Sequence, residues 1–197
     1  MVEIIKRAFP TRLWLATLTR APGIGRLVDY SLFWDDDIIY LPQDNVIQVN
    51  EPIDRQGDTV LPSAVVEHFI PEANQRWIMN FCLCREAVHC ADYPRELGCI
   101  FLGEAVLKIN PELGRLVSED EALAHLARCR EAGLVHMIGR KKLDRIWLGA
   151  TAGQKLMTIC NCCPCCCLWK ALPRLDNMIS QKVTRMPGVT VAVNNNC

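Results

Sequence analysis

The residues best able to do chemistry are the cysteines crowded into residues 160–167. Six of these eight positions are cysteine, namely Cys160, Cys162, Cys163, Cys165, Cys166 and Cys167. Cysteines this close along the chain are poorly placed to pair with one another, because a disulfide needs Cα atoms about 4.4 to 6.8 Å apart and converging Cβ vectors. Thiolates are natural ligands of zinc and of iron–sulfur clusters. The stretch therefore predicts a thiolate-ligated metal centre.

Residues 82–99 form a second cysteine-rich zone, on a segment rich in turn-forming residues. Its thiols belong to Cys82, Cys84, Cys90 and Cys99. Pro94 and Gly98 break the segment into turns, which suits a chain that wraps a metal centre better than one that merely buries four cysteines. Arg85 directly follows the Cys-x-Cys pair, and its charge is expected to offset the negative charge of a thiolate-bound cluster.

The number of thiols bears on which metal they hold. A single zinc ion takes about four ligands in a tetrahedron, and each iron–sulfur cubane also takes about four thiolates. The six and four cysteines of the two zones match one or two 4Fe-4S clusters better than one zinc ion. Zinc is the alternative cofactor, with about one ion in each zone.

The composition favours a reducing compartment and gives no sign of nucleic-acid binding. The 197 residues suffice for one medium domain or two small ones. Lys plus Arg and Asp plus Glu both number 22, so the overall charge does not favour a nucleic-acid partner. Ten of the twelve cysteines crowd into two zones and no secretory signal opens the chain, which favours metal ligation over disulfides. The expected location is the cytoplasm, with a peripheral position at the inner face of the membrane as a second option.

Residues 1–40 are expected to form an apolar and basic docking segment, ahead of a cysteine-rich domain over residues 41–197. In residues 1–21, basic side chains are interspersed with Trp14 and several aliphatic residues. The longest uncharged run, residues 13–19, is too short for a signal sequence or a membrane span. Contact with a membrane surface is one interpretation. Packing of an apolar helix face on the same domain or on a partner subunit is the favoured one.

The expected fold is a small mixed α+β domain, in which a spacer over residues 118–149 separates the two cysteine-rich, cluster-binding loops. Ser118 and Glu121 form a capping-box pattern that predicts the start of a helix. Residues 134–138 and 145–148 are predicted as two strands joined by a basic turn, and a helix followed by a β-hairpin is typical of the end of a winged helix. The predicted helix is acidic, so contact with a DNA backbone is not expected.

The cysteine pattern resembles that of a family of 4Fe-4S ferredoxin-like proteins of anaerobic bacteria and archaea. The matching residues, within residues 40–197, are Cys82-Leu83-Cys84-Arg85 with Cys90 and Cys99, and Cys160-Asn161-Cys162-Cys163 with Cys166 and Cys167. The resemblance implies a redox function, without a substrate, and leaves Cys165 outside the ligand set. Such proteins commonly continue into a Cys-x-x-Cys-x-x-Cys module, which this sequence lacks, so Cys197 is expected to match the first ligand of that module.

Three functions compete on these grounds. The first is electron transfer by an iron–sulfur subunit or module that works with a redox partner protein or partner subunit. The second is an oxidoreductase subunit whose surplus thiols bind an atypical cluster and act on a sulfur or disulfide substrate. The third is a zinc-stabilised, winged-helix-like binding module. No catalytic residue is assigned, because the sequence has no phosphate-binding glycine loop, zinc-binding His-Glu helix or nucleophile elbow. His136, between the two zones, is expected to lie beside the ligands.

Overall fold

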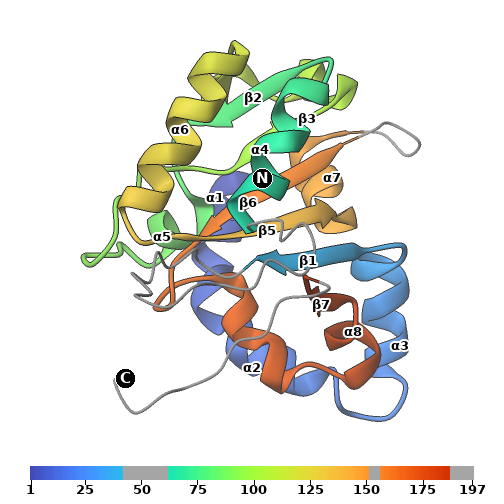
Figure 1. The fold of residues 1–197 in the computed structure, drawn as a ribbon. Coiled ribbons are helices and arrows are strands. Elements are labelled where there is room, and N and C mark those ends of the chain that lie inside the picture. The colour runs from blue at the N-terminus through green and yellow to red at the C-terminus, as the bar shows by residue number, and fades with distance from the viewer. Residues whose placement is uncertain (42–61, 151–155, 187–197) are drawn as a thin grey trace, which may run out of the picture.

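The structure is a computed structural model that describes residues 1–41, 62–150 and 156–186 of the chain (Figure 1). At its centre is a seven-stranded sheet with the strand order β4-β2-β3-β6-β5-β1-β7. Neighbouring strands are antiparallel, except that β1 and β7 run parallel. Helices and this mixed sheet together confirm the expected α+β class.

The elements have the following bounds. The strands are β1 (Asp37–Leu41), β2 (Arg76–Met79), β3 (Ile100–Leu102), β4 (Gly114–Leu116), β5 (Val135–Arg140), β6 (Met157–Cys162) and β7 (Val183–Arg185). The α-helices are α1 (Val2–Ala8), α2 (Arg12–Leu18), α3 (Ile24–Val28), α4 (Pro62–Glu72), α5 (Leu83–Ala87), α6 (Glu119–Glu131), α7 (Lys142–Leu148) and α8 (Asn177–Ser180). Shorter 3₁₀ or π turns are η1 (Phe9–Thr11), η2 (Asp29–Phe33), η3 (Glu104–Lys108), η4 (Pro111–Leu113) and η5 (Leu168–Arg174).

Alternation along the central strands gives the sheet two different faces, because successive side chains of a strand point to opposite sides. Ile100 of β3 and Ile159 of β6 pack in a core with buried residues of α4 and α6. Phe101, the next residue of β3, belongs to a separate core on the other side. Cys160 and Cys162 of β6 share a cavity with Phe101. The sheet therefore presents its cysteines on the face away from α4 and α6.

The helix predicted from the capping box is confirmed as α6. The Ser118 hydroxyl accepts a hydrogen bond from the Glu121 backbone N–H at 3.2 Å, and the Glu121 carboxylate accepts one from the Ser118 N–H at 3.0 Å. Gly133 follows the helix with a φ of 73°, a left-handed conformation that glycine adopts without strain. Local signals alone therefore define both ends of this helix.

The predicted β-hairpin after this helix is wrong. Its first strand exists as β5, but residues 145–148 belong to helix α7. The Lys142 backbone N–H at the start of α7 donates to the Asp36 carboxylate at 2.6 Å, and Gly149 ends the helix with a φ of 75°. Because β5 pairs with β1 and β6 instead of a hairpin partner, the described residues contain no winged-helix arrangement here.

The N-terminal residues 1–41 pack against the rest of the described chain. The Lys6 ammonium lies 4.7 Å from the centre of the Phe81 ring, and Ile5 and Phe9 line the cavity that holds the thiols. In Figure 1, β1 at the end of this segment runs between β5 and β7. None of the helices in the described residues is long and apolar enough to cross a membrane.

Candidate metal centre

Ten cysteines of the two zones meet in space, where they form two groups that each draw on both zones. The inner group consists of Cys82, Cys84, Cys99, Cys160, Cys162 and Cys167, which line one cavity together with Cys163. The outer group consists of Cys90, Cys163, Cys165 and Cys166. The two sequence zones are therefore not two separate sites.

Neighbouring cysteines of residues 160–167 are divided between the two groups. Cys162 is the last residue of β6 and belongs to the inner group. Cys163, the next residue, starts the following turn and belongs to the outer group by its sulfur distances, although it also lines the inner cavity. Cys166 and Cys167 are divided in the same way as the chain leaves this turn. In both places, a single peptide unit separates a cysteine of one group from a cysteine of the other.

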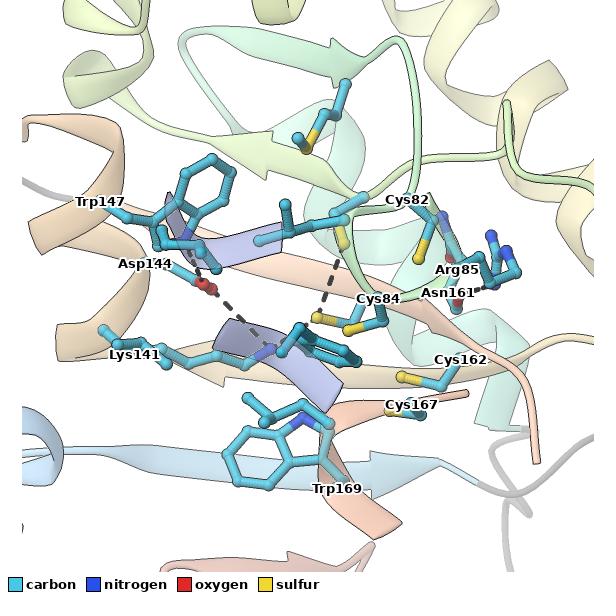
Figure 2. A pocket seen from close by; sticks show the side chains of 18 of the residues that line it. Cys82, Cys84, Arg85, Lys141, Asp144, Trp147, Asn161, Cys162, Cys167 and Trp169 are labelled. Carbon is cyan, nitrogen blue, oxygen red and sulfur yellow. Dashed lines mark hydrogen bonds and ion pairs between the residues drawn. The ribbon is translucent and has the colours of Figure 1, made fainter. Parts of the chain in front are cut away.

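The inner thiols surround a cavity of about 170 Å³. A cavity of roughly 10–15 Å³ already holds one water molecule, so this one has room for more than a single ion. Phe101, Trp147 and Trp169 line it as well, which makes its walls apolar apart from the thiols and a few charged groups. Figure 2 shows Cys84, Cys162 and Cys167 directed toward the same space as Trp169.

Strand register explains one pair of inner thiols. Because Ile100 pairs with Ile159 across β3 and β6, the adjoining Cys99 and Cys160 lie next to each other, with Sγ atoms 3.7 Å apart. Hydrogen bonds from the Cys162 and Cys99 thiols, together with the Lys141 ammonium, lower the pKa of Cys160. These contacts favour the thiolate form of Cys160, against the burial that favours neutral thiols in this cavity.

The remaining inner thiols are linked to this pair by contacts between neighbours. Hydrogen bonds with Cys162 and Cys84 lower the pKa of Cys167, and a hydrogen bond with Cys84, followed by burial, raises the pKa of Cys82. Among the described residues, only the outer group brings three or more metal-binding side-chain atoms within 4.8 Å of one another. The inner thiols thus line a wider space, in which sulfurs contact their neighbours without converging on one point.

The outer thiols, by contrast, converge on one point. The Sγ atom of Cys165 lies 3.5 Å from that of Cys90, 3.5 Å from that of Cys163 and 3.2 Å from that of Cys166. All four sulfurs lie within 4.8 Å of one another, so this group could hold a metal ion. Burial alone would raise the pKa of Cys90, but hydrogen bonds from Cys166 and from the backbone of Tyr93 lower it below its ordinary value.

No protein-family model, curated protein or solved structure matches this chain. The outer thiols form a cysteine cluster that could bind a metal ion. This agrees with the metal-binding part of what the resemblance implies, and with no more than that part. The kind of metal depends on what the donor sets and their surroundings favour.

Arg85 lies between the two thiol groups and is completely buried. Its guanidinium donates hydrogen bonds to the backbone carbonyls of Pro94, at 2.8 Å, Asn161, at 2.9 Å, and Leu97. Burial lowers its pKa, but interactions with the sulfurs of Cys82, Cys163 and Cys99 outweigh that effect and raise it. The expected charge compensation by Arg85 thus has a structural basis, and the same side chain also anchors both cysteine-bearing segments.

Lys141 places a second positive charge inside the inner cavity. Its Nζ atom lies 2.7 Å from Cys160 Sγ and 3.9 Å from an Asp144 carboxylate oxygen, and its ammonium faces the Trp169 ring at 5.6 Å (Figure 2). Burial lowers the pKa of Lys141, but the charges of Cys160 and Asp144 outweigh it and raise the pKa. The lysine therefore stays charged and stabilises negative charge at this end of the cavity.

Asp36 is the other carboxylate that lines the inner cavity. One of its oxygens accepts the Lys142 N–H, and the other is buried without a hydrogen-bond partner. Burial, together with the charge of Asp144, raises the pKa of Asp36 from 3.8 to about 6, against the opposing charges of Lys182 and Lys141. Keeping this group ionised is therefore unfavourable in the folded protein.

Replacing Asp36 by asparagine is expected to stabilise the protein above pH 6. The folded state holds the Asp36 proton more tightly than the unfolded state, so its stabilising contribution is complete below pH 3.8 and is lost as the pH rises through about 6. The shift of about two pKa units corresponds to at most roughly 3 kcal/mol. Asparagine keeps an oxygen for the Lys142 N–H. Denaturant unfolding of both proteins should show a gain for Asp36→Asn at pH 7.5 that shrinks at pH 4.5; a gain independent of pH would contradict this origin.

The structure places the other predicted site residues as follows. Cys165, which the resemblance left outside the ligand set, contacts all three other outer thiols. Its position in a tight Cys-Pro-Cys-Cys turn is the feature of the sequence that could have indicated these contacts. His136 contacts the Asn161 side chain at 2.9 Å, and Asn161 separates Cys160 from Cys162. Cys129 is fully buried in α6, outside both groups, and Cys197 lies outside the described residues.

Proposed function

We propose that this chain is an electron-transfer protein whose inner thiols hold an iron–sulfur cluster. The observation that carries the proposal is the set of seven cysteines from both zones, the six of the inner group and Cys163, that lines one cavity of about 170 Å³. A 4Fe-4S cluster takes about four thiolates and occupies more space than one ion. Among the described residues, no three inner sulfurs lie within 4.8 Å of one another, which supports a cluster of several metal atoms over a mononuclear site.

The surroundings of the inner thiols support a redox role. The protein tunes the potential of such a cluster through burial, charge and hydrogen bonds to sulfur. Here the walls are aromatic, and the cations of Lys141 and Arg85 offset the charge of the thiolates. No nucleotide-binding glycine loop is visible in the sequence, so electrons would be exchanged with a partner protein or subunit in a reducing compartment.

Metal analysis of the anaerobically purified protein tests this proposal. We expect iron and acid-labile sulfide in the native protein. Cys84→Ser should lose most of both, because Cys84 belongs to the inner group. The matched control is Cys129→Ala, which alters a buried cysteine that packs near Cys163 and Cys166 but is a member of neither group, and it should keep both iron and sulfide. A native protein without acid-labile sulfide would rule out the cluster and leave zinc as the metal.

Chemistry on a sulfur or disulfide substrate is the second candidate. Six inner thiols exceed the roughly four that a cubane needs, and Cys99 and Cys160 form a close pair beside the Lys141 ammonium. Such a pair could take part in reducing a substrate disulfide with electrons from the cluster and, ultimately, from a partner. A change in the cluster's spectrum on adding small thiols would favour this function, and an unchanged spectrum would favour simple electron transfer.

A further inference from the structure

We propose that the outer group, Cys90, Cys163, Cys165 and Cys166, is a separate site for a single zinc ion. This site would hold one metal atom instead of a cluster. Its role would be structural, because four sulfur ligands complete the tetrahedron around zinc and leave no open position. In proteins, zinc sites with four protein ligands are structural. The proposal goes beyond the electron-transfer function and does not depend on it.

The distances between the outer sulfurs fit one ion. With a zinc–sulfur bond of about 2.3 Å, the sulfurs of a regular tetrahedron lie about 3.8 Å apart. Three of the pairs here lie 3.5, 3.5 and 3.2 Å apart, and every pair lies within 4.8 Å. Zinc with four thiolates therefore needs only small movements of these side chains. A multi-iron cluster would need the sulfurs to move apart around it.

Hydrogen-bond donors lie beside two of the outer sulfurs, those of Cys163 and Cys90. The Cys166 backbone N–H donates to Cys163 Sγ at 3.4 Å, and the Arg85 side chain also contacts that sulfur. The sulfur of Cys90 accepts hydrogen bonds from the backbone of Asp92 and Tyr93. Such outer partners orient the ligands of a metal and stabilise their charge. Their presence distinguishes this group from cysteines that merely pack together.

The proposed ion ties together two segments that are distant in sequence. Cys90 lies just after α5, and the other three ligands lie in the turn between β6 and η5. The same turn carries Cys162 and Cys167 into the inner cavity. Zinc at the outer group would therefore fix the positions from which two inner thiols project. Its role is to hold the redox cavity in shape, without exchanging electrons itself.

A pair of adjacent substitutions tests the assignment. Cys166→Ser removes an outer ligand, whereas Cys167→Ser removes an inner thiol one residue away. In the anaerobically purified native protein we expect about one zinc per chain in addition to iron and sulfide. Cys166→Ser should lose the zinc and keep most of the iron and sulfide, and Cys167→Ser should do the reverse. Loss of iron and sulfide from both variants, with no zinc in the native protein, would overturn the proposal.

X-ray absorption at the zinc edge of the native protein gives a test that does not depend on a variant folding. We expect four sulfur neighbours at about 2.3 Å and no metal neighbour in the next shell. Mixed nitrogen and oxygen neighbours, or the absence of bound zinc, would overturn the assignment. A protein that contains this zinc but no sulfide would leave the outer site intact and rule out only the proposed electron-transfer function, so the two failures can be told apart.

Discussion

Replacing Arg85 by alanine is expected to lower the free energy of unfolding by roughly 3–5 kcal/mol, the range measured when one partner of a buried charged pair is removed. The guanidinium is fully buried and satisfies three backbone carbonyls, from Pro94, Leu97 and Asn161. Alanine would leave these carbonyls without their donor and the thiolates without a counter-charge. We also expect iron, sulfide and zinc contents to fall together, because Arg85 anchors segments of both groups.

Arg85→Lys and Arg95→Ala are the informative comparisons. Lysine keeps the charge, but its single ammonium cannot reproduce the planar fork that reaches three carbonyls, so an intermediate loss is expected. Arg95, in the same segment, forms an exposed ion pair with Glu86 at 3.4 Å and should matter little when replaced by alanine. Denaturant unfolding and metal analysis of the variants check this order. Equal effects of Arg85→Ala and Arg95→Ala would contradict the proposed role.

Lys141→Met is expected to make the reduction potential of the inner cluster more negative. The substitution removes a buried positive charge 2.7 Å from Cys160 Sγ, and a reduced cluster carries one more negative charge than an oxidised one. It also leaves Asp144 without its ammonium partner, so the free energy of unfolding should fall by roughly 3–5 kcal/mol. A redox titration monitored by the cluster's absorption measures the first effect.

Lys142→Met is the matched control for that experiment. Lys142 is the next residue along the chain, but its ammonium bonds to the Tyr30 carbonyl at the exposed side of the protein. Its backbone N–H, which caps α7 through Asp36, is unchanged by the substitution. The reduction potential of Lys142→Met should therefore match that of the native protein. If the two variants have the same potential, the charge of Lys141 does not act on the cluster.

Local patterns predicted part of this fold, and the failures share one cause. The start of α6 is defined by Ser118 and Glu121, which are three residues apart, so the sequence alone was enough. The start of α7 is capped by Asp36, which lies 106 residues before Lys142. Residues 145–148 by themselves do not indicate that contact, and their apolar and aromatic side chains are typical of a strand. Tertiary contacts overrode the local preference.

The candidate site shows the same division between local and long-range information. Cysteine spacing identified the two zones, but it could not show that each group takes thiols from both. The combination of thiols from both zones in the inner group depends on the register of β3 against β6, which places Cys99 beside Cys160. It also depends on the turn after β6, which brings Cys165 to Cys90. The cysteine spacing thus indicated a cysteine cluster that could bind a metal ion, but not which thiols share a group.

The single peptide units between Cys162 and Cys163 and between Cys166 and Cys167 limit how this site can be transplanted. Consecutive Cα atoms are only about 3.8 Å apart, so a ligand of one centre cannot be moved without moving a ligand of the other. A designer who grafts the inner thiols onto another scaffold would have to carry the outer turn and the Cys90 segment with them. The two centres therefore have to be transplanted together, as one unit.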